Sequence, residues 1–149
     1  MSTIKMLRMI VICFICCMAL CSQFINAAET PQSSQKDTAT IVAYYFHGDF
    51  RCSNCFTIEQ YSKEAIEKYF PEQLKNGKLT FNVINTDRPT NEHFVKDYQL
   101  YTRSLILAEF KNGKQVKWTN LSKVWDYIND RDAFYNYVKA EIEKYLKSL

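Results

Sequence analysis

An unbroken apolar run that leads directly into a pair of cysteines is the feature that most constrains the fold of this chain. Residues 41–46 are all apolar or aromatic, and this pattern is typical of a central strand covered on both faces. After a short loop, Cys52 and Cys55 open a segment whose apolar residues recur at three- and four-residue spacing until Pro71. The sequence therefore predicts a buried strand, a loop and an amphipathic helix, with both cysteines in the first turn of that helix.

The spacing of the two cysteines indicates a chemical role. Cysteines three residues apart in one helical turn bring both sulfurs within reach of one disulfide or one metal ion, and the helix N-terminus favours the thiolate. The periodicity places Cys55 inward and leaves Cys52 as the sulfur that meets a partner. A permanent disulfide is a weaker interpretation, because so short a loop gains little from chain entropy. Redox cycling, binding of a metal or metalloid, and an inert disulfide remain the three interpretations.

The N-terminal segment, residues 1–28, has the pattern of a secretory signal peptide. Lys5 and Arg8 precede an apolar run over residues 9–20, which small residues follow. The run is short for a membrane span, which needs about 20 residues. An uncleaved anchor and lipidation at Cys21 remain alternatives, and either way we expect a periplasmic or otherwise extracytoplasmic domain.

The rest of the chain has the size and charge of one ordinary domain. Of its 149 residues, 29–38 are polar and predict a flexible spacer before a domain over 39–149. Loss of Lys5 and Arg8 with the leader reduces 19 basic residues to 17, against 16 acidic ones, so the net charge is +1. This near neutrality argues against nucleic acid as a partner. No phosphate-binding glycine loop is present, so we expect no nucleotide cofactor. We also expect a monomer, which contacts a membrane only if the leader is retained.

Beyond the cysteine helix, the pattern predicts three more strands and two more helices. Asn112-Gly113 supplies the positive φ angles of a tight hairpin turn, and Asn91 is the predicted cap of a short helix. The expected elements are a strand with Leu79, Phe81 and Val83, a helix over 91–98, a strand over 105–108, a strand with Val116 and Trp118, and a helix over 132–146.

This order, with the cysteine pair at the first junction of strand and helix, resembles thioredoxin. The supporting segments are Gly77-Lys78-Leu79-Thr80, Asn85-Thr86-Asp87, Phe94 to Tyr98 with Leu100, and Phe110-Lys111-Asn112-Gly113. The resemblance implies an α/β fold, a mixed four-stranded sheet flanked by helices in the order β-α-β-α-β-β-α. It also implies that Cys52 attacks a partner and that Cys55 resolves the mixed disulfide.

The chain departs from thioredoxin at two places. Arg103 takes the position before the third strand where thioredoxins have a cis-proline, and residues 41–46 lack the buried acid of that family. Residues 45–48 and 51–59 are more similar to a small group of bacterial envelope thioredoxin-like proteins labelled ArsF-like or nitrophenyl compound nitroreductase subunits. That resemblance implies an association with arsenic resistance.

We therefore predict an exported thiol-disulfide oxidoreductase that exchanges disulfides with an envelope protein. Arg51 is expected to stabilise the Cys52 thiolate, and the predicted substrate contacts are Phe50, Phe56, Arg103 and Ser104. The alternatives are a dithiol carrier for a soft metal ion or arsenite, with His47 as a third ligand, and an accessory subunit of an arsenic-associated nitroreductase system. Glu59 is expected to be a solvated acid that could relay a proton.

Overall fold

The computed structural model describes residues 39–149, so the predicted leader, spacer and Cys21 lie outside the described residues. The strands are β1 (Ala39–His47), β2 (Leu79–Asn85), β3 (Ser104–Lys111) and β4 (Lys114–Asn120). The helices are α2 (Ser53–Tyr69), α3 (Pro71–Lys75), α4 (His93–Asp97) and α5 (Arg131–Leu146), with short 3₁₀ turns at η1 (Pro89–Asn91) and η2 (Ser122–Val124). None of the helices in this part of the chain is long and apolar enough to cross a membrane.

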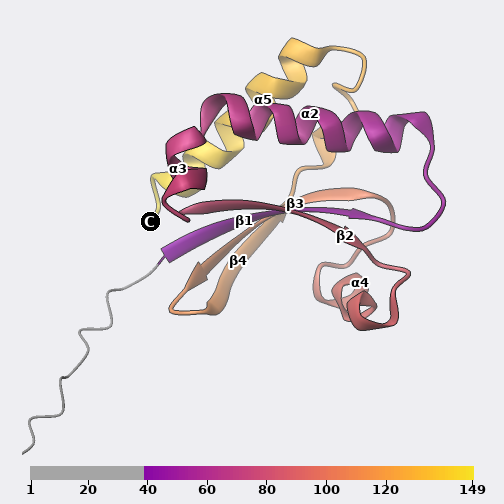
Figure 1. Ribbon diagram of the computed structural model, residues 1–149, viewed down its shortest axis with the longest axis horizontal. Helices are drawn as coiled ribbons and strands as arrows, with labels where there is room; N and C mark the ends of the chain where they lie inside the picture. The colour runs from indigo at the N-terminus through magenta and orange to yellow at the C-terminus, as the bar shows by residue number, and fades with distance from the viewer. Residues whose placement is uncertain (1–38) are drawn as a thin grey trace, which may run out of the picture. The chain divides into compact units, whose positions relative to one another are not determined.

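The four strands form one mixed sheet in the order β2-β1-β3-β4. β1 and β2 run parallel, whereas β1 with β3 and β3 with β4 run antiparallel. In Figure 1, α2 and α5 lie over one face of this sheet and α4 lies over the other. The predicted fold class, a mixed four-stranded sheet flanked by helices, is confirmed.

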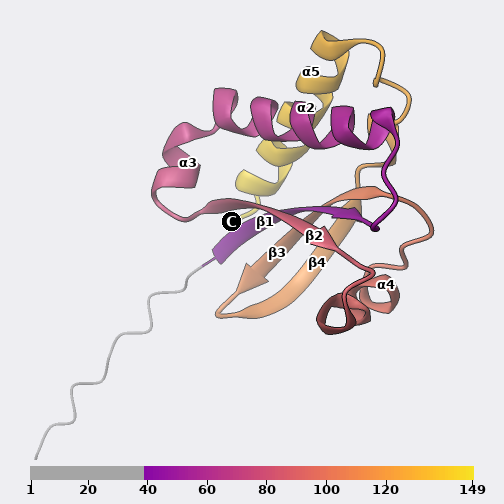
Figure 2. The same cartoon turned by 45° about the vertical axis from the view of Figure 1, so that its right-hand side comes forward.

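β1 is buried on both faces, as its unbroken apolar sequence predicts. Ile41, Ala43 and Tyr45 pack in the large core with α2 and α5, while Phe46 belongs to a smaller core on the side of α4. Successive side chains of a strand point to opposite faces, so the apolar and aromatic run over residues 41–46 needs cover on both. Figure 2 shows the two helical layers with the sheet between them.

The turn after β3 has the predicted form. Asn112 and Gly113 have φ angles of 52° and 76°, in the left-handed region that a tight hairpin requires.

α5 begins at Arg131, one residue before the predicted start, and Asp130 caps it by accepting a hydrogen bond from the backbone N–H of Ala133 at 3.0 Å.

The prediction that Pro71 ends the cysteine helix is confirmed, but the short helix after it was not predicted, and the predicted cap of α4 is wrong. Pro71 ends α2 but also begins α3, because its fixed φ and missing N–H suit the first position of a helix. Asn91 does not cap α4, since it lies in η1 and its side-chain Nδ2 donates to the backbone carbonyl of Asn85 at 2.9 Å. The amide of Asn91 thus stabilises the chain after β2 instead of a helix start.

Candidate dithiol site

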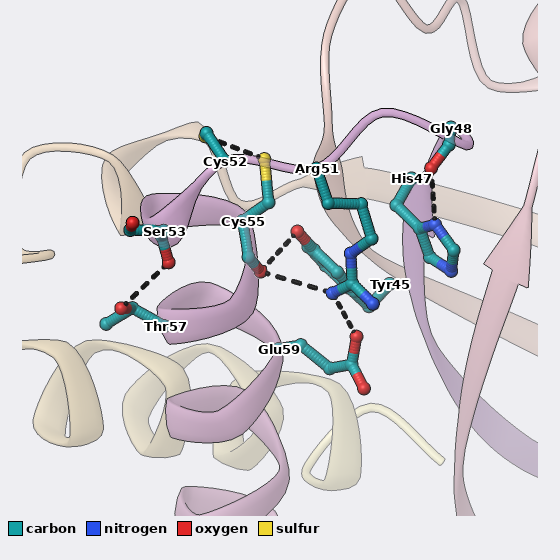
Figure 3. A network of polar contacts seen from close by, with 9 residues as sticks. All are labelled: Tyr45, His47, Gly48, Arg51, Cys52, Ser53, Cys55, Thr57 and Glu59. Carbon is teal, nitrogen blue, oxygen red and sulfur yellow. Dashed lines mark hydrogen bonds and ion pairs between the residues drawn. The ribbon is translucent and has the colours of Figure 1, made fainter.

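The cysteine pair lies where the loop after β1 enters α2. Cys52 is the N-cap residue of α2, with an extended backbone at φ −89° and ψ 170°, and Cys55 lies in the first turn. The backbone N–H of Cys55 donates to the carbonyl of Cys52 at 3.0 Å. The extended cap residue and the helical turn after it bring the two side chains together (Figure 3).

The two sulfurs are close but unequal in exposure. Both cysteines are free, and their Sγ atoms lie 3.0 Å apart. Cys52 is exposed, whereas Cys55 is 2% exposed, as the helical periodicity predicts. A disulfide bond is about 2.05 Å long, so a small movement would join the pair.

The surroundings separate the acidities of the two thiols. A hydrogen bond from the Cys55 thiol, together with backbone N–H groups of the first turn, lowers the pKa of Cys52. Burial, and the hydrogen bond that Cys55 donates to the Cys52 sulfur, raise the pKa of Cys55. The exposed sulfur is therefore the one that ionises first, and the buried sulfur keeps its proton.

Arg51 precedes the pair but is turned toward α2. Its guanidinium forms an ion pair with Glu59, lies 4.2 Å from the centre of the Phe56 ring and donates to the carbonyl of Cys55 at 3.5 Å. The largest causes of the lowered pKa of Cys52 are hydrogen bonds from Cys55 and the backbone, not this charge. The role of Arg51 at the thiolate stays a prediction, and Glu59 is an ion-pair partner instead of a fully solvated acid.

Tyr45 is a site residue that sequence reasoning missed. Its hydroxyl donates to the carbonyl of Cys55 at 2.7 Å from a fully buried position in β1. Burial raises the pKa of Tyr45, so the hydroxyl keeps the proton that it donates. A tyrosine inside an otherwise apolar strand is the signal, because a buried hydroxyl needs a partner.

Arg103 lies beside the cysteines from the other side. It directly precedes β3, its Nη2 donates to the carbonyl of Phe50, and its own carbonyl accepts from Trp125 Nε1 at 3.1 Å. Its charge favours the thiolate of Cys55, although burial outweighs that effect. Ser104 is different: it is buried, and its hydroxyl donates to the carbonyl of Thr102 at 2.9 Å.

These residues surround an open pocket at the dithiol. Its lining residues are Phe50, Arg51, Cys52, Cys55, Arg103 and Trp125. Of the four predicted substrate contacts, Phe50 and Arg103 line this pocket, Phe56 is half-exposed under Arg51, and Ser104 does not reach it. Trp125, which follows η2, is the second residue that sequence reasoning missed, since nothing in the local pattern indicates where that segment packs.

His47 does not join the cysteines as a metal ligand. Its Nδ1 donates to the carbonyl of Gly48 at 2.8 Å, and Figure 3 shows the ring turned toward that residue. Within residues 39–149, no three histidine, cysteine or acidic side chains converge as a metal site. The described residues therefore do not support the alternative in which His47 provides a third ligand.

Of the comparisons with known proteins, the one with solved structures finds thioredoxins. No protein-family profile matches the chain, and no curated protein matches it. Among solved structures, thioredoxin from Fasciola hepatica is 21% identical, with 62% of this chain and 81% of that chain covered and a TM-score of 0.38. The thioredoxin pre-protein of Schistosoma mansoni is 23% identical, with 64% and 80% covered and a TM-score of 0.36. A Plasmodium falciparum thioredoxin is 20% identical, with 60% and 79% covered and a TM-score of 0.36.

Proposed function

We propose that this protein is a thiol-disulfide oxidoreductase that works through Cys52 and Cys55. The observation that carries the proposal is the inequality of two neighbouring thiols. The sulfurs are 3.0 Å apart, and the exposed one has the lowered pKa while the buried one has the raised pKa. A nucleophilic thiolate must be accessible, and a resolving thiol must wait protonated beside it.

In the proposed reaction, the Cys52 thiolate attacks one sulfur of a partner disulfide. A bond forms between Cys52 Sγ and that sulfur, the partner's disulfide breaks, and the second partner sulfur leaves as a thiolate. This leaving thiolate can take the proton of Cys55. The Cys55 thiolate then attacks Cys52 Sγ, which forms the Cys52–Cys55 disulfide and releases the first partner sulfur, which takes up a proton from water. The partner gains two electrons and the protein loses two.

The protein groups around Cys55 serve this second attack. Tyr45 and Arg51 both donate to the carbonyl of Cys55, which holds the first turn of α2 in place. Arg103 favours the thiolate form of Cys55 at the moment when Cys52 has lost its charge in the mixed disulfide. No acidic residue lines the pocket, so we assign the proton acceptor to the partner's own leaving thiolate.

We further propose that the protein works outside the cytoplasm on a protein partner of the bacterial envelope. The support is the charged and apolar pattern of residues 1–28, which is typical of a secretory signal peptide. The similarity of residues 45–48 and 51–59 to ArsF-like proteins makes a partner from an arsenic-resistance system the first candidate.

The trapping experiment uses the Cys55→Ser variant. Without the resolving thiol, Cys52 should stay joined to its partner as a mixed disulfide that is visible by non-reducing electrophoresis of envelope extracts. The double variant Cys52→Ser/Cys55→Ser is the matched control and should trap nothing. If Cys55→Ser traps no more protein than the double variant, disulfide exchange with an envelope partner is not its function.

A further inference from the structure

The two arginines of the pocket differ in how their charges are balanced. Arg51 forms an ion pair with Glu59, so the pair adds no net charge. Arg103 forms no ion pair with any acidic residue in the described part of the chain, and its guanidinium hydrogen bond goes to a neutral backbone carbonyl, that of Phe50. One unbalanced positive charge therefore borders the dithiol.

The remaining lining of the pocket does not offset that charge. Beside the two arginines and the cysteines it consists of Phe50 and Trp125, with no carboxylate. Phe50 is 87% exposed, and Tyr101, two residues before Arg103, is 96% exposed. A molecule that reaches Cys52 thus meets the exposed Phe50 ring and one cation without an ion-pair partner.

The position of Arg103 is fixed before any partner arrives. Its side chain is tied to the carbonyl of Phe50, which lies two residues before Cys52, and its backbone carbonyl is tied to the indole of Trp125. A preorganised cation loses little conformational freedom when an anion binds beside it. Arginine is also the side chain whose geometry best matches a carboxylate.

We propose, on the basis of the proposed function, that Arg103 selects disulfides that carry a carboxylate near the reacting sulfur. When Cys52 is joined to such a partner, its own thiolate charge is gone and the partner's carboxylate lies beside the Arg103 guanidinium. Resolution by Cys55 then releases the partner as described above, with the same balance of electrons and protons. The carboxylate can belong to a small thiol compound, such as glutathione, or to an acidic residue next to a cysteine in a protein.

Three small disulfides of different charge test this selectivity. The reduced protein is mixed with oxidised glutathione, which is anionic, with bis(2-hydroxyethyl) disulfide, which is neutral, or with cystamine, which is cationic. Formation of the Cys52–Cys55 disulfide is followed by alkylation and mass shift. Comparison of each rate between wild type and Arg103→Gln cancels the intrinsic reactivity of each disulfide. We expect the variant to lose about tenfold with oxidised glutathione relative to the neutral disulfide, within the range of electrostatic rate effects. The loss should be absent with cystamine.

The controls separate charge from structure. Arg103→Lys keeps the charge but loses the planar guanidinium, so it should keep part of the preference, between wild type and Arg103→Gln. Added salt should weaken the preference of the wild type. Lys114→Gln removes one charge at the hairpin between β3 and β4. The register places this hairpin beside Ala39, at the opposite end of β1 from the cysteines, so the variant should leave the preference unchanged. If Arg103→Gln fails to fold, Arg103→Lys and the salt dependence of the wild type still test the proposal.

Peptide disulfides with Glu or Lys next to the cysteine distinguish the two sources of the carboxylate. Discrimination by Arg103 among peptides alone indicates a protein partner, and discrimination among the small disulfides alone indicates a small thiol compound. Equal rate changes for all charges in both sets would overturn the selectivity while leaving the proposed function intact. A wild type that reacts with none of these disulfides would overturn the proposed function itself.

Discussion

Removal of the two lysines that neutralise Glu109 should destabilise the domain far more than removal of either one. Glu109 is a carboxylate in β3 that is only 2% exposed. Lys111 Nζ lies 3.1 Å from one of its oxygens and Lys117 Nζ lies 2.8 Å from the other. The hydroxyl of Ser148, just after α5, also donates to it at 3.4 Å.

The size of the expected destabilisation follows from the way the two lysines share the carboxylate of Glu109, one on each oxygen. Lys117→Met or Lys111→Met alone leaves one ammonium group on the carboxylate, and since both lysines are partly exposed, each change should cost about 1 kcal/mol of unfolding free energy. The double variant leaves Glu109 buried with only Ser148 as a partner. Loss of the charges around a buried ion costs about 3 to 5 kcal/mol, and we expect about 3 kcal/mol here because the site lies near the surface. The effects should therefore be more than additive.

The pH dependence has a definite sign. Burial alone would raise the pKa of Glu109, but hydrogen bonds and charges from Lys117 and Lys111 outweigh it and hold the pKa below its usual value. In the wild type, this group contributes stability above the unfolded pKa, about 4.3, and that stability is lost as pH falls through the lower folded pKa. In the double variant burial is opposed only by the long hydrogen bond from Ser148, so the folded pKa should rise above the unfolded one. Acidification should then reduce the penalty of the double variant.

Urea unfolding followed by circular dichroism, at neutral pH and near pH 4, measures both effects. Lys63→Met is the control, because the ion pair of Lys63 with Glu67 on α2 is 3.9 Å long and exposed, so its loss should cost less than about 0.5 kcal/mol. Additive losses in the double variant, or a penalty that grows as the pH falls, would refute the reasoning.

Three further predictions concern the dithiol site. Because the pKa of Cys52 is lowered, iodoacetamide should label it at lower pH than an ordinary free cysteine, and a profile at or above the ordinary one would contradict the site geometry. Cys55→Ala removes the hydrogen bond that is the largest cause of the lowered pKa of Cys52, so the labelling profile should move to higher pH. The move should be smaller for Cys55→Ser. Identical profiles for Cys55→Ala and wild type would show that the thiol contact has no effect. Tyr45→Phe removes the hydrogen bond to the Cys55 carbonyl and should lower the free energy of unfolding by about 1 kcal/mol, measured in urea. Tyr101 is 96% exposed, so Tyr101→Phe should change that free energy by less than about 0.5 kcal/mol. Equal effects of the two variants would count against the Tyr45 contact.

Local patterns in the sequence predicted the parts of the fold that depend on local physics. The unbroken apolar run predicted β1 as a strand buried on both faces, and the helical spacing predicted that Cys55 is the buried sulfur. Asn112-Gly113 predicted the hairpin because its φ angles belong to few residue types. In each case the residues that decide the structure are neighbours in the sequence.

The parts that could not be predicted depend on contacts between distant segments. Trp125 reaches the pocket only because η2 packs beside the start of β3, and Asn91 binds the carbonyl of Asn85 in competition with the helix start that it was predicted to cap. Arg51 was expected at the thiolate on the basis of sequence proximity alone. The ion pair with Glu59, two helical turns further along, determines where its charge lies.

A redox titration of the two thiols tests the central claim most directly. The purified protein is equilibrated in glutathione and dithiothreitol buffers of graded potential, alkylated and mapped by mass spectrometry at Cys52 and Cys55. We predict one two-electron transition between reduced and disulfide forms, within the range of roughly −270 to −120 mV that dithiol oxidoreductases span, and its loss in Cys52→Ser. A disulfide that stays oxidised across the whole series, or thiols that resist alkylation until a chelator is added, would contradict the account. The first result would indicate an inert crosslink, and the second a carrier of a soft metal or arsenite.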